Sequence, residues 1–394
     1  MNFIFISPHF PVNYSNFCVQ LKANGINVLG IGDAEYDSLV MDLRNALTEY
    51  YRVDNMEDYD QMLRAVAYFT FKYGKIDWLE SNNEYWLEQD ARLREDFNIG
   101  NGFRPCDIAQ IKSKFKMKEK YRNMGIPAPA CILADDWEHA QLFMNEYGLP
   151  LILKPDSGVG AQSTYTIGRK EDLEEFFEQA HGQKFVLEQF VEGEICSYDA
   201  VINSKGEPIF ETGNITPVSI MDIVNTRDSV YFYIVKQLAE DVRDAGRRCI
   251  KAFDVRSRFV HFEFFRLKKD CKNLGKAGTI VGLEVNMRPS GGYTPDMINY
   301  ANSVNVFKIW ADMVMYDSSQ VDQQKEHFFC AYVGRRFGKE YKHSHVEVLS
   351  KYRANITMSD RMPDVLASAM GDQMYLAKFR DEQVMNEFFD YALS

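Results

Sequence analysis

The spacing of apolar residues in the N-terminal quarter of the chain predicts a parallel sheet. Short apolar runs at 2–6, 28–31 and 76–79 are separated by segments with helical spacing at 17–24, 59–70 and 86–97. Strands and helices alternate in this way when helices cover a parallel sheet. We therefore predict an α/β domain over residues 1–103.

A different pattern begins at the breaker cluster Gly125-Ile-Pro-Ala-Pro129. It predicts strands at 149–155, 165–167, 185–191, 197–202, 208–210, 259–267 and 279–286, and helices at 171–180 and 238–252. Several strands follow one another through short turns, as antiparallel strands do. We predict an α+β domain over residues 104–318, in which about 126–190 form a lid subdomain. The apolar stripe of helix 171–180 should pack on the lid sheet.

The last part of the chain has shorter elements. Apolar runs at 328–333, 346–349 and 374–378 predict strands, and an amphipathic helix follows at 383–393. We predict a small C-terminal domain over residues 319–394.

Composition limits the partners of the protein. The chain has 394 residues and a net charge of −12, which disfavours binding to phosphate backbones. No apolar run reaches the roughly 18 to 20 residues that span a bilayer, and the N-terminus lacks a basic leader. Seven scattered cysteines without a C-x-x-C pair argue against disulfides and structural zinc. We predict a cytoplasmic protein whose partners are small molecules, not nucleic acids or membranes.

The stretch from 149 to 167 has the features of a loop that folds over a nucleotide. Its centre, 156–164, contains Gly158 and Gly160, which allow a backbone to approach a phosphate. Lys154 lies in the apolar run before this loop, and a buried ammonium requires an anionic partner such as a phosphate. The alternative is a plain hairpin with a Gly/Ser turn. The pattern matches neither the Walker nor the Rossmann motif.

A run of alternating lysines precedes the breaker cluster, on a helix predicted at 112–124. Lys114 and Lys118 share one face of this helix, and Lys116 and Lys120 share another. We expect most of these lysines to be solvated and one to face inward and bind phosphate.

Two predicted strands carry candidate metal ligands. Alternation places Glu284 and Asn286 on one face of the strand at 279–286, with Val281, Leu283 and Val285 on the other. In the strand at 259–267, His261, Glu263 and Phe265 share a face. If the strands pair with Glu263 and Glu284 on the same side, their oxygens suit Mg²⁺. The alternative is a half-exposed sheet with solvated carboxylates. Arg288 follows and can bind a phosphoryl group.

Carboxylates also follow the buried run at 185–187. Glu188 comes directly after it, and Glu192 and Glu194 come next. A carboxylate can accept hydrogen bonds from an adenine amino group or from ribose hydroxyls. For Glu192, a charged turn is an equally good interpretation.

Five motifs in this order resemble an ATP-grasp enzyme of the carboxylate-amine (L-amino acid) ligase type. They are Ser113-Lys114, the segment 152–160, the segment 188–194, Glu263, and Glu284-Val-Asn-Met-Arg288. The resemblance covers about 104–318. It implies that ATP lies between two α+β subdomains, that a carboxylate attacks the γ-phosphate to give an acylphosphate and ADP, and that an amine then displaces phosphate. Mg²⁺, or Mn²⁺ in its place, would assist.

The resemblance also implies roles for individual residues. Phosphates would contact Lys114 and Lys154, and Lys154 and Arg288 would be catalytic. The ATP-binding set would further include Ser157, Gly158, Gly160, Ser163, Glu188, Phe190, Val191 and Glu194, and the metal ligands would be Glu263, Glu284 and Asn286. Glu194 would bind ribose, although the family order Gly-x-Glu reads Gly193-Glu194-Ile195 here. Ser113 and Met287 stand where many relatives have Asp and Pro.

Several alternatives stay open. The acceptor could differ, as in a glycinamide-forming purine-type enzyme or a bicarbonate-using carboxylase, or the protein could be an ATP-binding regulator without turnover. The sequence leaves open the carboxylate, the amine and whether the protein is a homodimer. His9, Arg288, Gly291, Gly292 and Tyr293 are candidate substrate contacts by position, with ordinary loop packing as the simpler interpretation.

Overall fold

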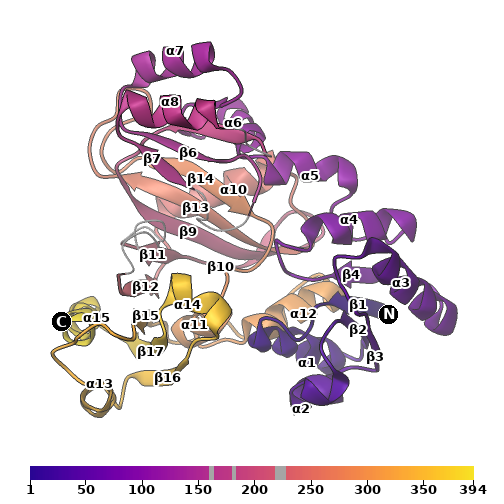
Figure 1. The fold of residues 1–394 in the computed structure, drawn as a ribbon. Helices are drawn as coiled ribbons and strands as arrows, with labels where there is room; N and C mark the ends of the chain where they lie inside the picture. Colours follow the sequence, from indigo (N-terminus) through magenta and orange to yellow (C-terminus); the bar gives the residue numbers. More distant parts are fainter. Residues whose placement is uncertain (159–163, 180–182, 218–227) are drawn as a thin grey trace.

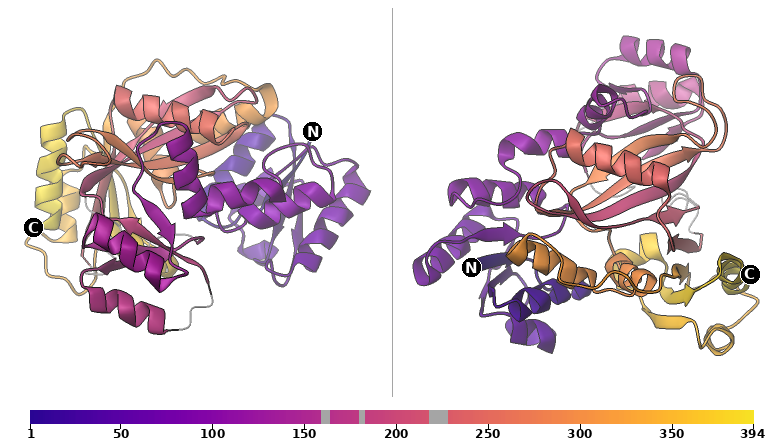
Figure 2. Two further views of the ribbon diagram at one scale, coloured as in Figure 1. Left: turned by 90° about the horizontal axis from the view of Figure 1, so that it is seen from above. Right: turned by 180° about the vertical axis from the view of Figure 1, so that it is seen from behind.

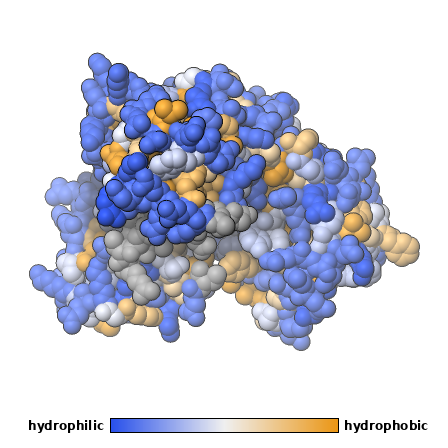
Figure 3. All heavy atoms as spheres, turned by 45° about the horizontal axis from the view of Figure 1, so that its top comes forward, coloured by the Kyte–Doolittle hydropathy of each residue, from blue (hydrophilic) through white to orange (hydrophobic). Residues whose placement is uncertain are grey.

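The computed structural model describes residues 1–158, 164–179, 183–217 and 228–394. Its strands form three sheets, which lie in the N-terminal part, in the lid and in the centre of the molecule. Figure 1 shows the lid at the top, the N-terminal part at the lower right and the C-terminal segment at the lower left. The face shown in Figure 3 is mainly hydrophilic, with small scattered apolar patches.

The N-terminal sheet is parallel throughout, with the order β3-β2-β1-β4. Its strands are β1 (Asn2–Ile6), β2 (Asn27–Gly32), β3 (Glu49–Arg52) and β4 (Trp78–Glu80). Phe3 and Phe5 of β1 enter one core, whereas Ile4 and Ile6 enter the core on the other face. A parallel strand buried on both faces reads as a continuous apolar run, which explains why β1 was predictable. The predicted fold class of this part is confirmed.

Helices cover both faces of this sheet. They are α1 (Ser15–Ala23), α2 (Met41–Ala46), α3 (Tyr59–Tyr73) and α4 (Leu87–Asp96), with short 3-10 turns at Val12–Tyr14 and Tyr36–Ser38. A later helix, α12 (Val306–Tyr316), joins them from the central part, where Phe307 stacks edge-on against Phe17 at 4.8 Å between ring centroids. The two parts therefore share a core.

The lid is an antiparallel sheet with the order β5-β8-β6-β7. Its strands are β5 (Cys131–Leu133), β6 (Leu151–Pro155), β7 (Tyr165–Ile167) and β8 (Phe185–Gln189). The helices α7 (Trp137–Tyr147) and α8 (Lys170–Glu178) lie together over one face (Figure 1). Leu173 of α8 packs with Leu151 and Leu187, as the apolar stripe predicts. The segment at 137–147 was not predicted as a helix.

The basic helix differs from the prediction at its start. α5 (Pro105–Lys112) ends at Ser113, which is extended with ψ 116°, and α6 (Lys114–Asn123) begins after it. The Ser113 hydroxyl accepts a hydrogen bond from the Lys116 amide at 3.2 Å, so serine acts as the N-cap of the second helix. The predicted single helix at 112–124 therefore begins two residues later.

The central sheet has the order β14-β13-β9-β11-β12-β15-β17-β16, with β10 paired to β9. The strands are β9 (Gly193–Ile202), β10 (Pro208–Thr212), β11 (Asn214–Thr216), β12 (Val230–Ile234), β13 (Arg258–Leu267), β14 (Ile280–Asn286), β15 (Phe329–Arg335), β16 (Ile356–Arg361) and β17 (Gln373–Phe379). All neighbours are antiparallel. The helix α10 (Glu240–Ala252) covers the face turned away from the lid (Figure 2).

The C-terminal strands continue this central sheet, because β15 pairs with β12. The remaining helices are α11 (Thr294–Asn302), α13 (His345–Lys351), α14 (Asp364–Met370) and α15 (Glu382–Leu393). α13 corrects the strand predicted at 346–349: Ser344 and Glu347 form a capping box, which favours a helix. The domain boundary at 318/319 stays a prediction. No helix in the described part of the chain is long and apolar enough to cross a membrane.

Candidate active site

The start of α6 is tied to the end of lid strand β6. Both the Ser113 hydroxyl and the Phe115 amide donate to Asp156 Oδ1, at 2.9 and 3.0 Å, and the Lys114 amide donates to the Asp156 carbonyl at 2.9 Å. A carboxylate at a helix N-terminus is stabilised by the free amides there. These bonds place Lys114 beside the segment that leads into the predicted loop.

Three buried lysines converge between the lid and the central sheet. Lys154 Nζ lies 2.8 Å from Glu188 Oε2, and Lys118 Nζ lies 3.8 Å from Glu188 Oε1. Lys114 Nζ lies 3.7 Å from Glu284 Oε1 and 3.5 Å from the Gly158 carbonyl. The predicted phosphate set is therefore brought together, but Lys154 does not need a ligand as its anionic partner. Glu188 supplies that charge, which corrects our expectation.

Lys118 is the lysine that the sequence did not single out. It is 0% exposed and donates to the carbonyls of Gly282 and Leu283 at 3.2 and 2.6 Å. Lys118 lies four residues after Lys114 and therefore on the same helix face. This spacing was the sequence feature that could have indicated that Lys118 also faces inward. Two lysines of this helix, not one, face inward.

Burial and ion pairing act against each other in this cluster. Burial lowers the pKa of Lys118 to about 8, although Glu188 opposes this. Burial also opposes the charge of Lys154, but Glu188 and Glu284 together outweigh burial and raise the pKa of Lys154. The pKa of Glu188 is lowered because Lys118 and Lys154 outweigh its burial. Glu188 is thus held as a carboxylate, and among the described residues its Oε1 atom has no hydrogen-bond partner.

The two predicted metal carboxylates are direct neighbours. In the β13–β14 ladder Glu263 pairs with Glu284, and His261 pairs with Asn286. Directly opposite residues of antiparallel strands share a face, so Glu263, Glu284 and Asn286 lie together as predicted.

A register shift next to the Glu263–Glu284 pair shows that the alternation predicted for the first half of β14 was wrong. Phe264 pairs with Gly282, so Leu283 is skipped. Val281 therefore packs with Phe265 and Val191, whereas Val285 packs in the α10 core. A bulge of this kind reverses the side-chain parity along a strand. The two carbonyls that Lys118 binds lie at this bulge.

The sequence also did not predict a chain of hydrogen-bonded side chains that ends at Glu263. His261 Nδ1 lies 2.8 Å from Asp199 Oδ1, and His261 Nε2 lies 3.2 Å from Glu263 Oε1; Ser197 donates to the same Asp199 carboxylate. Burial alone would lower the pKa of His261, but Asp199 and Glu263 raise it to about 9. The imidazolium therefore lowers the pKa of Glu263 despite its burial and fixes its orientation.

The donor set fits a magnesium ion that is completed by phosphate oxygens. No group of three or more His, Cys, Asp or Glu side chains in the described ranges is placed to hold a metal. Two carboxylates and the Asn286 amide oxygen remain, and Mg²⁺ is usually held by one or two carboxylates together with substrate phosphates. Arg288 donates to Asn286 Oδ1 at 3.2 Å and to the Pro289 carbonyl at 2.9 Å, so its guanidinium lies beside this set.

The strand register places Glu194 on the opposite face of the central sheet from Glu263 and Glu284. Glu194 pairs with Arg266, and Ile195 pairs with Phe265. Because neighbours along a strand point to opposite faces, Ile195 shares the face of Glu263 and Glu284, whereas Glu194 lies on the α10 face. The departure from the Gly-x-Glu order therefore puts an isoleucine where the family order has the carboxylate. Glu192 forms an ion pair with Lys269 at the surface.

The remaining ATP-site predictions divide into two groups. Ser157 and Gly158 lie at the start of the predicted loop, where Gly158 has φ 147°, a conformation that glycine adopts without strain. Val191 is buried and Phe190 is 40% exposed, both just beyond Glu188. Gly160 and Ser163 lie outside the described residues.

Comparison with known proteins finds a matching family model over part of the chain and several similar proteins. Residues 111–216 match the family model of the ATP-grasp domain, so the chain contains an ATP-grasp domain, as the resemblance predicts. The chain is 22% identical over 284 residues to the L-arginine-specific L-amino acid ligase of Bacillus subtilis, a match that covers 68% of this chain and 64% of that protein. It is 24% identical over 225 residues to the carbamoyl phosphate synthase large chain of Caldanaerobacter subterraneus subsp. tengcongensis, covering 55% of this chain and 19% of that protein. Both matches span less than two thirds of the relative.

Solved structures extend the likeness to the whole chain. An L-amino acid ligase from Bacillus licheniformis superposes with a TM-score of 0.71 at 14% identity, covering 99% of this chain and 97% of that one. N5-carboxyaminoimidazole ribonucleotide synthetase from Thermotoga maritima gives 0.67 at 16% identity, with 99% and 97% covered. Phosphoribosylglycinamide synthetase from Anaerococcus prevotii gives 0.65 at 13%, with 99% and 96% covered. The predicted ATP-grasp fold is confirmed.

Proposed function

We propose that the protein is an ATP-dependent ligase that activates a carboxylate as an acylphosphate and joins it to an amine. The observation that carries this proposal is the shared face of Glu263, Glu284 and Asn286, with Lys114, Lys154 and Arg288 around it. Phosphoryl transfer asks a protein mainly for positioning and charge neutralisation, and these residues offer both.

The adenine end of ATP has a suitable site beside β8. The free Oε1 atom of Glu188 can accept a hydrogen bond from the adenine amino group. Val191, Phe265 and Val281 form an apolar cluster nearby, on which the flat base can pack. The backbone at Phe190 and Val191 can read the base edge.

The phosphates would lie toward Lys114, Lys118 and Lys154. These lysines are paired with Glu188 and Glu284 in the structure, and phosphates would replace or share these partners. Mg²⁺ held by Glu263, Glu284 and Asn286 would neutralise charge on the transferred group. Arg288 would steady the substrate carboxylate and the acylphosphate, from which the amine displaces phosphate.

A phosphate-release screen tests this function. Purified protein would be incubated with ATP and either Mg²⁺ or Mn²⁺, and with amino acids or other carboxylates, including bicarbonate, paired with amines. We expect at least one pair to yield ADP and phosphate in equal amounts. AMP and pyrophosphate as products would rule out the acylphosphate route, and ATP binding without turnover for every pair would indicate a regulator.

A further inference from the structure

The face of the central sheet that carries the predicted metal ligands has two neighbouring rows of side chains. One row contains Glu284, Glu263 and Ser197, which lie directly opposite one another on β14, β13 and β9. The next row is mainly apolar and lies two residues, or about 7 Å, further along β13 and β9. It consists of Val281, Phe265, Ile195 and Thr216. A nucleotide whose base packs on the apolar row and whose phosphates meet the metal ligands has its sugar over the boundary between the two rows.

The hydroxyl groups at this boundary are engaged within the protein. The Ser197 hydroxyl donates to the Asp199 carboxylate and accepts a hydrogen bond from the Asn214 amide at 2.9 Å. Thr216 carries the hydroxyl of the apolar row and donates to Asn214 Oδ1 at 3.4 Å. Neither hydroxyl carries a charge, so neither can give the sugar the strong hydrogen bond that a carboxylate gives.

The two β9 residues that face the base patch have no polar side chain. Ile195 lies directly opposite Phe265, and Gly193 is the next residue of β9 on the same face. A Cβ atom at Gly193 would lie 2.8 Å from Phe265 Cβ, so this position has no room for a side chain. Ile195 is half-buried, and its exposed part is hydrocarbon. A sugar placed here meets an apolar surface.

The carboxylate between these two residues, Glu194, lies on the other face of the sheet. Glu194 pairs with Arg266 in the β9–β13 ladder. Arg266 Nη1 and Nη2 donate to the carboxylate of Asp241, in α10, at 2.5 and 2.9 Å. Because directly opposite residues of antiparallel strands share a face, this contact with α10 independently places Glu194 on the α10 side of the sheet, away from the proposed nucleotide.

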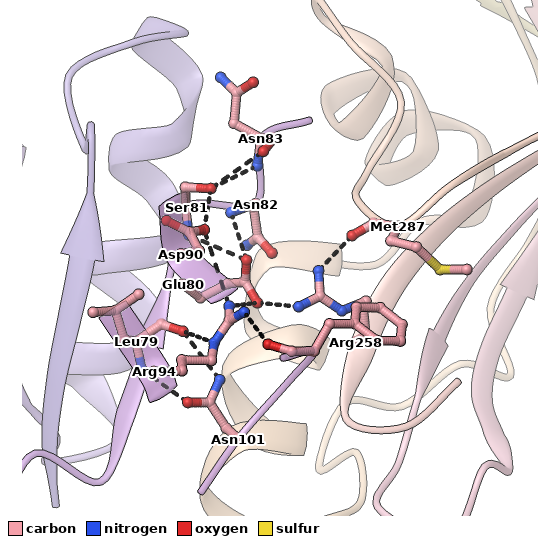
Figure 4. A network of polar contacts seen from close by, with 11 residues as sticks. Leu79, Glu80, Ser81, Asn82, Asn83, Asp90, Arg94, Asn101, Arg258 and Met287 are labelled. Carbon is pink, nitrogen blue, oxygen red and sulfur yellow. Dashed lines mark hydrogen bonds and ion pairs between the residues drawn. The ribbon is translucent and has the colours of Figure 1, made fainter. Parts of the chain in front are cut away.

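The register that decides which residue faces the sugar is anchored at both ends of β13. A slip of one residue would exchange the two faces and bring Glu194 to the nucleotide side. At the start of β13, Arg258 donates to the Met287 carbonyl and forms an ion pair with Glu80, both at 2.6 Å (Figure 4). Near the end of β13, Arg266 is held by α10. The position of Ile195 is therefore fixed by contacts outside the nucleotide site.

We propose that the protein binds the sugar of its nucleotide on Ile195 and Phe265 without a charged partner for the hydroxyls, and so accepts 2′-deoxy-ATP and 3′-deoxy-ATP about as well as ATP. This inference rests on the proposed function for the places of the base and the phosphates. A protein strongly rejects an analogue that lacks a hydroxyl only when its own polar groups are then left unpaired. Here the sugar leaves no such group behind, so the base and the phosphates carry the specificity.

Binding measurements test this inference independently of turnover. The protein with Mg²⁺ would be titrated calorimetrically with ATP, 2′-deoxy-ATP and 3′-deoxy-ATP, without a carboxylate or amine substrate. We expect the three dissociation constants to agree within about threefold. The Ile195→Glu variant places a carboxylate on the nucleotide face. It should bind ATP about tenfold or more tightly than at least one of the two deoxynucleotides, which is the effect of a hydrogen bond to a charged group.

The matched control is Glu194→Gln, which removes the neighbouring carboxylate on the α10 face and should leave all three affinities unchanged. The wild-type affinities decide the inference even if Ile195→Glu does not fold. A preference of the wild type for ATP of about tenfold or more over either deoxynucleotide overturns it, as does a change of the affinity ratios in Glu194→Gln. Similar affinities without ADP formation for any substrate pair would instead refute the proposed function alone, and failure of all three nucleotides to bind would refute both.

Discussion

Replacing Lys154 by methionine should destabilise the protein as well as weaken ATP binding. Met retains the apolar stem of the side chain but removes the ammonium that lies 2.8 Å from Glu188. Glu188 is 3% exposed, and Lys118 at 3.8 Å lies beyond hydrogen-bond distance. Removing one member of a buried pair costs about 3 to 5 kcal/mol. Because Lys118 still offers a positive charge, we expect about 3 kcal/mol, the lower end of that range.

The measurement is urea unfolding at neutral pH, with ATP affinity determined on the same samples. The double variant Lys154→Met/Glu188→Gln removes the orphaned charge and should recover part of the lost stability, while ATP affinity stays low. The matched control is Lys170→Met in the same lid, where the partner Glu174 lies at 2.9 Å but the two side chains are 45% and 42% exposed. An exposed pair contributes about 0 to 1 kcal/mol. The reasoning fails if Lys154→Met unfolds with the free energy of the wild type.

Three further predictions address the metal face and its surroundings. Glu284→Gln should lower the rate of phosphoryl transfer by orders of magnitude, with a smaller loss of nucleotide affinity. The control is Glu192→Gln, which changes a surface ion pair and should turn over nearly normally. Equal losses of the two variants in single-turnover rates would contradict the assignment of Glu284 as a metal ligand. Lys114→Met should weaken nucleotide binding at equilibrium more than Lys116→Met, because only Lys114 lies beside Glu284 and Gly158. The pKa of His261 is raised to about 9 in the folded protein. Protonated His261 should therefore add roughly 3 kcal/mol to the free energy of unfolding below about pH 6.5, and this contribution should be lost as pH rises through about 9. Urea unfolding of wild type and His261→Asn in EDTA should therefore converge toward pH 10, and parallel curves would refute this.

The parts of the site that the sequence predicted are those set by strand periodicity. Alternation within a strand is strict over a few residues, so the side chains that share a face with Glu263 in one strand, and with Glu284 in the other, could be predicted. The direct pairing of Glu263 with Glu284 was conditional, since the register between two strands depends on the turn and on neighbouring strands. The bulge at Leu283 was not predictable from alternation, and it reversed the expected side of Val281.

The contacts that the sequence did not predict come from distant segments. Lys154 and Glu188 become partners because β6 and β8 are neighbours in the lid, whereas the sequence showed only a lysine in an apolar run. His261 and Asp199 meet through the β13–β9 ladder. The helix at 345–351 was missed because a short apolar run fits either a strand or a helix.

The lysines of the candidate site are neutralised by carboxylates of the same site, and these ion pairs affect how the site would bind ATP. Each lysine that faces the proposed phosphates already lies near a carboxylate, Glu188 or Glu284. Phosphates entering the site would therefore exchange one set of charged hydrogen bonds for another, so binding energy would come largely from multiple phosphate contacts and the metal ion. Glu188 Oε1, which has no hydrogen-bond partner among the described residues, would be available to the adenine amino group throughout. The ion pairs thus fix the positions of the lysines, which is the preorganisation that electrostatic catalysis of the proposed reaction would require.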